Sequence, residues 1–336
     1  MSVAVIKPGL LTSIQDLGRP GHAALGVGRA GAMDPVALRL ANALVGNPVN
    51  TAALEISLIG PTLQFHRAAQ IAITGAPLSA SLDGRTLRHW CAQDVPAGGV
   101  LQLGAMPRGA RSYLAIRAGF DLAAVLGSLS TDLHGGIGPW HARALRAGDA
   151  LPLAVDALAD RSDLQRGRPD ATWSLDPSSW FDTDEQPVLR LLPGAHFAEL
   201  DTASKSQLLE TAFRIGVDSD RVGVRLDGAS LHLAVPRELC SSGVAPGTVQ
   251  LPPGGQPIVL MAESPTTGGY PRIAHVIAVD QPRLAQRRPG DTVRFTLTDL
   301  PGAHEALVRR EQALVRLEAE ILRRRTERHA QHRSEL

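Results

Sequence analysis

Leu58-Ile59-Gly60-Pro61-Thr62-Leu63 has a counterpart in the second half of the chain, Leu226-Asp227-Gly228-Ala229-Ser230-Leu231. In each half a proline-containing segment with a Gly-Gly pair follows, as Pro96-Ala97-Gly98-Gly99 and as Pro252-Pro253-Gly254-Gly255. Segments that recur in the same order at similar spacing are typical of a duplicated structural unit. The sequence therefore predicts two tandem copies of one fold.

Two further echoes extend the repeat. Tyr113-Leu114-Ala115-Ile116 resembles Tyr270-Pro271-Arg272-Ile273, and Arg146-Ala147-Gly148-Asp149 resembles Arg288-Pro289-Gly290-Asp291. Inside each copy, short apolar runs are interrupted by glycine and proline, which is typical of a β-barrel or β-sandwich. We therefore expect a mainly β protein with few helices.

The repeat and the local composition together predict the boundaries of the units. We expect a first domain over residues 1–155 and a second domain over residues 187–300. Residues 156–186 are rich in Asp, Arg, Ser and Pro with little periodicity, which indicates a linker or an extended crossover. Residues 301–336 remain for a C-terminal amphipathic helix.

Composition excludes several classes of protein. The 336 residues are 44% apolar and carry a formal net charge of only +1, so the chain has enough apolar residues for substantial cores and no basic surface typical of nucleic-acid binding. No run is long and apolar enough to cross a membrane, and the N-terminus has no secretory signal pattern. We therefore expect a cytoplasmic protein that binds neither nucleic acid nor membrane.

Lysine is nearly absent from the chain, with only Lys7 and Lys205. The sequence consequently has no G-x-x-x-x-G-K-[ST] phosphate-binding loop and no lysine motif for attaching biotin or a lipoyl group. Any such cofactor has to be bound in another way or by another chain. The eleven histidines form no known ligand motif, and we predict no metal site.

Two helices stand out. Asp34 is suited to cap the first, Pro35 suits its first turn, and an apolar stripe runs to Gly46 and Asn47. In the C-terminal helix, expected over about residues 303–328, apolar pairs recur every seven residues. These pairs are Leu307/Val308, Leu314/Val315 and Ile321/Leu322. That helix either docks on its own domain or binds a partner.

Ser264-Pro265-Thr266-Thr267-Gly268-Gly269-Tyr270-Pro271 concentrates hydroxyl groups, glycines and a phenol between two apolar segments. The segments 256–261 and 273–279 are typical of buried strands. Because glycine has no Cβ, the loop can present backbone N–H groups closely to a ligand. The segment is either a ligand-binding loop or an ordinary β-hairpin loop.

Several motifs occur together in an order that resembles a known family. They are Pro8-Gly9-Leu10-Leu11-Thr12-Ser13-Ile14-Gln15-Asp16-Leu17-Gly18-Arg19, Gly31-Ala32-Met33-Asp34, Ala41-Asn42-Ala43-Leu44-Val45-Gly46-Asn47, Leu54-Glu55, Gly60-Pro61, Leu126-Gly127-Ser128, Ser130-Thr131, Ser219-Asp220-Arg221-Val222-Gly223-Val224-Arg225-Leu226 and the Thr266–Pro271 loop. With these residues the chain resembles the family called 5-oxoprolinase C subunit, KipI antagonist, or allophanate hydrolase subunit 2-like biotin-dependent carboxyltransferase.

The resemblance implies two cyclophilin-like β-barrels in tandem. It also implies that the chain works with a KipI-like B subunit together with a LamB/YcsF-like A subunit in the ATP-dependent conversion of 5-oxo-L-proline to L-glutamate. Two alternatives remain open. One is a urea carboxylase-like carboxyltransferase that uses biotin carried by another chain, and the other is a module that binds a KipI-like partner without chemistry of its own.

The family motifs also imply candidate site residues for a lactam or ureido substrate. Arg221 is the first candidate, because a guanidinium is suited to stabilise negative charge on a carbonyl oxygen. The alternative is a salt bridge to Asp220 or Asp218. Tyr270 is a candidate proton donor, or else a phenol that caps the barrel core.

Further candidates follow from the same motifs, each with a structural alternative. Asp34 is either a catalytic residue or only the cap of the first helix. The candidate substrate-binding residues are Gln15, Asp16, Arg19, Asn42, Glu55, Thr266, Thr267, Gly268 and Gly269. Loop closure is the alternative for residues 15–19, and pairing with an arginine is the alternative for Glu55. Glu263 stands where the resemblance leads us to expect a shorter aspartate.

Overall fold

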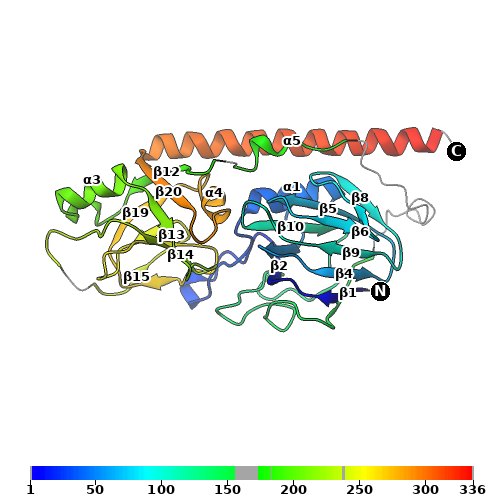
Figure 1. Cartoon of the computed structure of the whole chain (residues 1–336), viewed down its shortest axis with the longest axis horizontal. Helices are drawn as coiled ribbons and strands as arrows, with labels where there is room; N and C mark the ends of the chain where they lie inside the picture. Colours follow the sequence, from blue (N-terminus) through cyan, green and yellow to red (C-terminus); the bar gives the residue numbers. More distant parts are fainter. Residues whose placement is uncertain (1, 156–172, 183, 237–238, 335–336) are drawn as a thin grey trace.

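The computed structural model of the chain describes residues 2–155, 173–182, 184–236 and 239–334. These residues form two β-rich units that lie side by side, with a long helix running across both (Figure 1). We call them the first unit, which contains strands β1 to β11, and the second unit, which contains strands β12 to β20. The predicted fold class, mainly β with few helices and a C-terminal helix, is confirmed.

The first unit consists of two antiparallel sheets. One sheet has the order β11 (Ala150–Pro152), β1 (Ser2–Lys7), β4 (Thr62–Phe65), β9 (Val100–Leu103), β6 (Ala80–Leu82) and β7 (Arg85–Thr86). The other has the order β2 (Leu11–Gln15), β3 (Ala53–Ser57), β10 (Arg111–Ile116), β5 (Ala69–Gly75) and β8 (Ala92–Val95). Helix α1 (Pro35–Val45) packs against β5 and β10.

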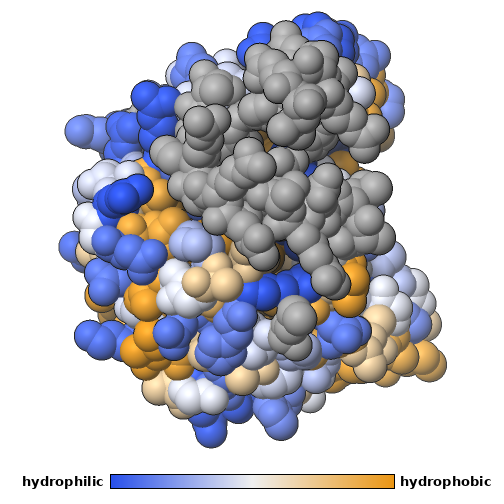
Figure 2. All heavy atoms as spheres, turned by 90° about the vertical axis from the view of Figure 1, so that its right-hand side faces the viewer, coloured by the Kyte–Doolittle hydropathy of each residue, from blue (hydrophilic) through white to orange (hydrophobic). Residues whose placement is uncertain are grey.

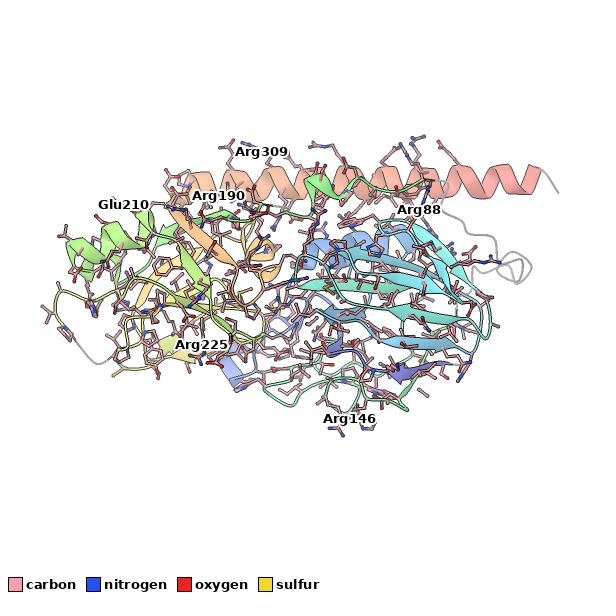
Figure 3. The ribbon with its side chains drawn as sticks, viewed as in Figure 1. Arg88, Arg146, Arg190, Glu210, Arg225 and Arg309 are labelled. Atoms are coloured by element: carbon pink, nitrogen blue, oxygen red, sulfur yellow. The ribbon has the colours of Figure 1, made fainter. Side chains whose placement is uncertain are left out.

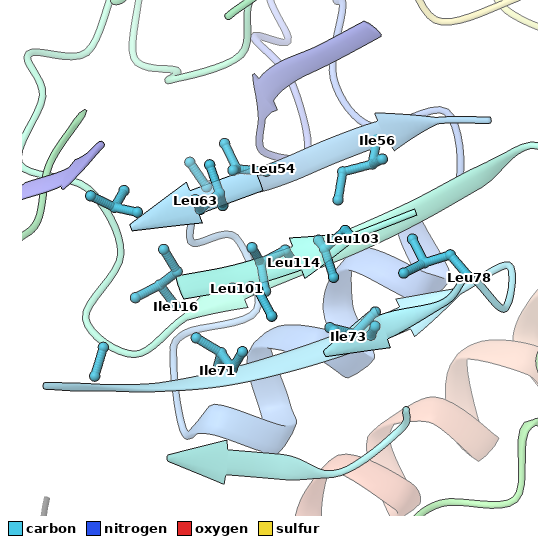
Figure 4. Close-up of a cluster of buried hydrophobic side chains, with 14 of the residues drawn as sticks. Leu54, Ile56, Leu63, Ile71, Ile73, Leu78, Leu101, Leu103, Leu114 and Ile116 are labelled. Carbon is cyan, nitrogen blue, oxygen red and sulfur yellow. The ribbon is translucent and has the colours of Figure 1, made fainter. Parts of the chain in front are cut away.

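The core of the first unit lies between its two sheets. Its side chains alternate along the strands, so that every second residue faces inward. Figure 4 shows Leu54 and Ile56 from β3 and Leu114 and Ile116 from β10 gathered with Leu63 from β4. On the outside, polar and apolar side chains are interspersed over the face shown in Figure 2.

The second unit is a closed seven-stranded barrel. Around it the order is β12 (Val188–Pro193), β19 (Arg272–Val276), β16 (Thr248–Gln250), β17 (Ile258–Leu260), β14 (Gly223–Asp227), β13 (Phe213–Ile215) and β20 (Thr292–Leu297). The parallel pairing of β12 with β20 closes it. A separate hairpin joins β15 (Ser242–Gly243) to β18 (Thr267–Gly268).

Short helices lie in the connections of both units. The α-helices are α3 (Thr202–Glu210) and α4 (Gln281–Ala285), and the 3₁₀ turns are η1 (Ala23–Leu25), η2 (Pro177–Ser179) and η3 (Phe197–Glu199). The loop that contains η1 leaves the first unit and reaches the second, as Figure 1 shows in blue. Met33, which ends this loop, packs in the core of the second unit.

The predicted repeat is visible as matching turns. Before β11, the Arg146 N–H donates to the Asp149 carboxylate at 2.7 Å, and before β20 the Arg288 N–H donates to Asp291 at 2.8 Å. A positive φ of 89° at Gly148 and of 95° at Gly290 is needed in both turns, and glycine adopts it without steric cost. The sequence echo at these positions therefore reports the same local structure.

Helix α5 (Leu300–Ser334) docks on the body of the protein. Leu314 and Ile321 are fully buried in the core of the first unit, and the Arg310 guanidinium donates to the Ala278 carbonyl of the second unit. Arg309 lies on the outer side of the helix, where Figure 3 labels it. The helix is therefore docked, but on both units and not only on its own domain.

The predicted linker over residues 156–186 falls mostly outside the described residues, which omit 156–172 and 183. The part that is described does pack: Trp173, Leu175, Trp180 and Phe181 lie against the core of the first unit. The domain boundaries themselves stay a prediction.

Candidate functional site

Arg221 joins the two units at the centre of a buried polar cluster. It lies just before β14 in the second unit and is only 4% exposed. Its Nη1 group donates to Glu55 on β3 of the first unit, its Nε group donates to Glu263 at 2.5 Å, and its Nη2 group donates to the Gly31 carbonyl at 2.7 Å. Burial alone would lower the pKa of Arg221, but the two carboxylates outweigh burial and raise it.

These partners correct one expectation. Arg221 does not pair with Asp220 or Asp218 in the described structure. The Asp220 carboxylate instead accepts hydrogen bonds from the N–H groups of Val222 and Gly223 at 2.8 and 3.0 Å. Asp220 therefore serves the local turn, whereas Arg221 reaches across to the other unit.

Glu55 is bonded on both of its oxygens. While Oε1 accepts from Arg221, Oε2 accepts from the Tyr113 hydroxyl at 2.7 Å and from the Met33 N–H at 2.8 Å. The Tyr113 oxygen in turn accepts the Asp34 N–H at 2.7 Å. Burial, with Glu55 and Asp34 nearby, raises the pKa of Tyr113 well above its ordinary value, so this phenol remains protonated. The predicted pairing of Glu55 with an arginine is confirmed.

Asp34 caps helix α1, as the sequence predicts. Its Oδ1 atom accepts the Ala37 N–H at 3.0 Å, and its Oδ2 atom accepts from the Gln286 side chain at 2.8 Å. Burial raises the pKa of Asp34 to about 6, against the opposing effect of the hydrogen bonds from Gln286 and Ala37. Asp34 is thus a carboxyl group that titrates near neutral pH.

Gln286, at the end of α4, fastens the second unit to the first. Its Oε1 atom accepts from the N–H groups of Ala110 and Arg111 at 3.2 and 3.0 Å. Its Nε2 group donates to Asp34 and to the Arg111 carbonyl at 2.8 and 3.1 Å. A glutamine side chain has two donors and two acceptor positions, so all four are used in this contact.

Asp16 organises a second buried cluster, within the first unit. Its Oδ1 atom accepts from the Gly18 N–H at 2.7 Å and from the hydroxyls of Ser128 and Ser130 at 2.6 Å each. Its Oδ2 atom accepts the Leu129 N–H at 2.7 Å. Four hydrogen bonds to one carboxylate hold the loop after β2 against residues 128–130.

Arg19 lies beside this cluster and is 1% exposed. Its Nη2 group donates to the Ser130 carbonyl, whereas its Nε and Nη1 atoms have no hydrogen-bond partner among the residues that the structure describes. Asp132, Asp16 and Glu263 are close enough to favour its charged form, although burial lowers the pKa of Arg19 overall. Glu263 therefore lies near both Arg19 and Arg221.

A cleft of about 520 Å³ opens between the two units beside Arg221. Both units contribute apolar side chains to its walls, among them Leu10, Leu58, Ile215 and Val217. Its charged and polar lining consists of Ser57, Arg111, His134, Ser219, Asp220, Arg221, Glu263 and Arg287. A mostly apolar cleft with a few convergent polar groups is the usual form of a small-molecule site.

The structure brings some predicted residues together and separates others. Arg221 lines the cleft, and Glu55 contacts Arg221. Gln15 donates to the Thr131 carbonyl at 2.8 Å within the Asp16 cluster. Asn42 supports the end of α1, because its Nδ2 group donates to the Thr51 carbonyl at 2.6 Å.

The Thr266–Gly269 segment lies away from the lining of the cleft. Thr267 and Gly268 form β18, which pairs with β15 in the hairpin on the second unit. Tyr270 is 46% exposed. The prediction that the Tyr270 phenol caps the barrel core is therefore wrong. The ligand-loop interpretation of this segment stays a prediction.

Sequence reasoning missed Tyr113, Arg111 and Gln286 as members of the site. In the sequence, Tyr113 stood out only by its similarity to Tyr270 in the repeat. The two residues differ in burial, because Tyr113 is fully buried and Tyr270 is 46% exposed. Arg111 and Gln286 lie 175 positions apart in the sequence, so no local spacing could connect them.

No helix in the described part of the chain has the length and apolar character needed to cross a bilayer. Within the same residues, no three His, Cys, Asp or Glu side chains gather in a way that could hold a metal ion.

Comparisons with known proteins agree with the fold. A family model described as "Carboxyltransferase domain, subdomain A and B" matches residues 25–297. The chain is 40% identical over 304 residues to the 5-oxoprolinase C subunit of Escherichia coli (strain K12), which covers 90% of this chain and 93% of the relative. It is 38% identical over 291 residues to the 5-oxoprolinase C subunit of Haemophilus influenzae, covering 87% and 89% of the two chains.

A solved structure shows the same architecture. The crystal structure of the Kluyveromyces lactis urea carboxylase matches with a TM-score of 0.83 and 28% identity, covering 93% of this chain and 29% of that one. The chain thus corresponds to less than a third of that larger protein. From the family match over residues 25–297 and the two bacterial relatives, the chain belongs to the family of carboxyltransferase domains with subdomains A and B, which includes proteins named as the C subunit of 5-oxoprolinase.

Proposed function

We propose that the chain is the C subunit of an ATP-dependent 5-oxoprolinase complex and helps to convert 5-oxo-L-proline to L-glutamate. The relative from Escherichia coli, similar over nearly its whole length, supports this assignment. One structural observation carries it: a buried arginine, fixed by carboxylates from both units, lines a cleft of about 520 Å³. The lactam would bind in that cleft.

Arg221 would act on the lactam carbonyl. When a lactam opens, negative charge develops on the carbonyl oxygen, and fixed N–H donors aimed at that oxygen stabilise the transition state. Three of the five N–H groups of Arg221 bond to Glu55, Glu263 and Gly31. Two more N–H groups are left to donate to the substrate, and the raised pKa keeps the guanidinium charged.

The other candidate residues take supporting roles in this proposal. Asp34 and Glu55 position the polar network behind Arg221, and the cluster of Gln15, Asp16 and Arg19 closes the site from the first unit. Because Tyr270 is exposed, we propose that it and the Thr266–Gly269 hairpin act where another chain of the complex completes the site. Asn42 supports α1.

ATP would be used by the complex rather than bound in this cleft. The sequence has no G-x-x-x-x-G-K-[ST] phosphate-binding loop, and neither Lys7 nor Lys205 lines the cleft. We therefore place the ATP chemistry on other chains of the complex. The proposed partners are a KipI-like B subunit together with a LamB/YcsF-like A subunit, in the cytoplasm.

Carboxyl transfer is the second candidate function, favoured by the match to the Kluyveromyces lactis urea carboxylase. The apolar walls of the cleft and Arg221 suit a ureido ring as well as a lactam. Biotin attached to another chain would then supply a carboxyl group. This chain's own contribution would be to hold the acceptor and to keep water out of the cleft.

Reconstitution tests the proposed function. The chain is combined with its KipI-like and LamB/YcsF-like partners, and 5-oxoproline-dependent ATP hydrolysis and glutamate formation are measured with each protein omitted in turn. We expect activity to disappear without this chain. We also expect at least a tenfold loss in Arg221→Lys, which keeps the charge but not the planar fork of donors. Activity that is indifferent to this chain would rule out the assignment and favour biotin-dependent carboxylation.

A further inference from the structure

Arg111, at the start of β10, differs from the other arginines that line the cleft. Its Nη1 group donates to the Ala285 carbonyl of the second unit, and its Nε atom is buried without a hydrogen-bond partner among the described residues. Within those residues, no carboxylate lies within ion-pair distance of its guanidinium. A partly buried guanidinium with one hydrogen bond for its five N–H groups has donors left that a ligand can satisfy.

The two neighbouring arginines already have partners for their charge or for each of their nitrogens. Arg221 is paired with two carboxylates. Each of the three nitrogens of Arg287 donates to a backbone carbonyl, namely those of Arg283, Asp184 and Asp182. Arg111 is therefore the arginine of the described lining whose Nη2 group is left for a ligand.

The backbone of Arg111 is held firmly. Both its N–H group and its carbonyl bond to Gln286, at 3.0 and 3.1 Å. With the Nη1 group tethered to Ala285 as well, the side chain is fixed at both ends. A side chain that is already ordered loses little entropy when it binds a ligand, so this arginine is preorganised for binding.

We propose that the Nη2 group of Arg111, which has no hydrogen-bond partner among the described residues, donates to a carboxylate in the cleft. This inference rests on the proposed function and names the chemical class of its substrate: a lactam that carries a carboxylate, with its ring against Leu10 and Leu58. Arginine is suited to this task because it stays charged, and a charged hydrogen bond to a carboxylate is about twice as strong as a neutral one. A neutral lactam would leave Arg111 unpaired.

The carboxylate that Arg111 binds has two candidate sources. The carboxylate is either that of the substrate itself or a carboxyl group delivered to the cleft by another chain. Binding to the full-length chain distinguishes them, with 5-oxo-L-proline, the neutral lactam 2-pyrrolidinone, and bicarbonate as probes. Dissociation constants are measured by ligand-observed NMR for the wild type and for Arg111→Gln, Arg111→Lys and Arg287→Gln.

Arg287→Gln is the matched control, because it removes the same charge from the same cleft at an arginine whose donors are already used. We expect wild-type protein to bind 5-oxo-L-proline at least tenfold more tightly than 2-pyrrolidinone, since charged hydrogen bonds contribute this much. Arg111→Gln should abolish the difference, Arg111→Lys should keep part of it, and Arg287→Gln should keep most of it. Circular dichroism checks that each variant is folded.

Each other outcome has a definite meaning. Bicarbonate binding that is lost in Arg111→Gln, with no preference for 5-oxo-L-proline, assigns the site to a delivered carboxyl group. Equal binding of the two lactams by wild type, or equal losses in Arg111→Gln and Arg287→Gln, overturns the proposal, and so does the absence of any Arg111-dependent binding. The omission assay on the reconstituted complex reports separately on the proposed function, so that the two claims can fail independently.

Discussion

The guanidinium of Arg221 and the carboxylate of Glu55 form a buried ion pair that joins the second unit to the first. Each partner is held by further bonds, Arg221 by Glu263 and Glu55 by Tyr113. An ion pair of this kind is costly to break by removal of one partner, because the other charge is left buried without compensation. The candidate site and the junction between the units therefore share these residues.

Arg221→Met should lower the free energy of unfolding by about 3–5 kcal/mol, because Glu55 and Glu263 would lose their cation. Urea unfolding followed by circular dichroism measures the change. Arg225→Met is the matched control: Arg225 is exposed on β14, just after Arg221, where Figure 3 labels it, and its loss should cost no more than about 0.5 kcal/mol. Equal effects of the two substitutions would show that the buried pair is not formed.

Asp34 should make stability depend on pH. Its pKa is raised from 3.8 to about 6 on folding, so the folded state binds the proton more tightly than the unfolded state does. The stabilisation is complete below pH 4 and is lost as the pH rises through 6, by about 3 kcal/mol in total. Asp34→Ser keeps a capping oxygen and does not titrate. The stability of the wild type relative to this variant should therefore fall between pH 4 and pH 7, and a constant difference would contradict the assignment.

Gln286→Leu should destabilise the contact between the units. The leucine would leave the N–H groups of Ala110 and Arg111 and the Asp34 carboxylate without their partner, at a cost of about 3 kcal/mol. Differential scanning calorimetry gives the change in Tm. Gln312→Leu, at an exposed position of α5, should leave Tm nearly unchanged. If Gln286→Leu is equally harmless, the bonds between the units contribute nothing to stability.

Two adjacent residues test the docking of helix α5. Leu314 is fully buried in the core of the first unit, whereas Val315 is 58% exposed. Leu314→Ala should lower the free energy of unfolding by about 2–5 kcal/mol, and Val315→Ala by no more than about 0.5 kcal/mol. Guanidinium unfolding of both variants measures the difference. The reverse order would mean that the helix docks by its other face.

The parts of the fold that the sequence predicted are those that depend on local signals. Asp34, Pro35 and Gly46 mark the ends of α1 because caps and turn residues act within a few positions. The echo between residues 146–149 and 288–291 was readable because the same turn needs the same residues. The heptad spacing of Leu314 and Ile321 likewise predicted a C-terminal helix, but not whether it docks or binds a partner.

The candidate site was predictable only in part. The family motif identified Arg221, but its partners Glu55 and Glu263 come from segments whose approach depends on how the two units pack. No spacing in the chain reveals such a contact, and the nearby Asp220 was a misleading alternative. Arg111 gives no sequence signal at all, since its role depends on which of its donors remain unbonded after folding.

The position of bound substrate tests the central claim most directly. Crystals of the reconstituted complex, grown with 5-oxo-L-proline and a non-hydrolysable ATP analogue, would show where the lactam lies. We predict electron density in the cleft between the two units, with the lactam oxygen next to Arg221 and the carboxylate next to Arg111. Density for the lactam at another site, with none in this cleft, would contradict the account.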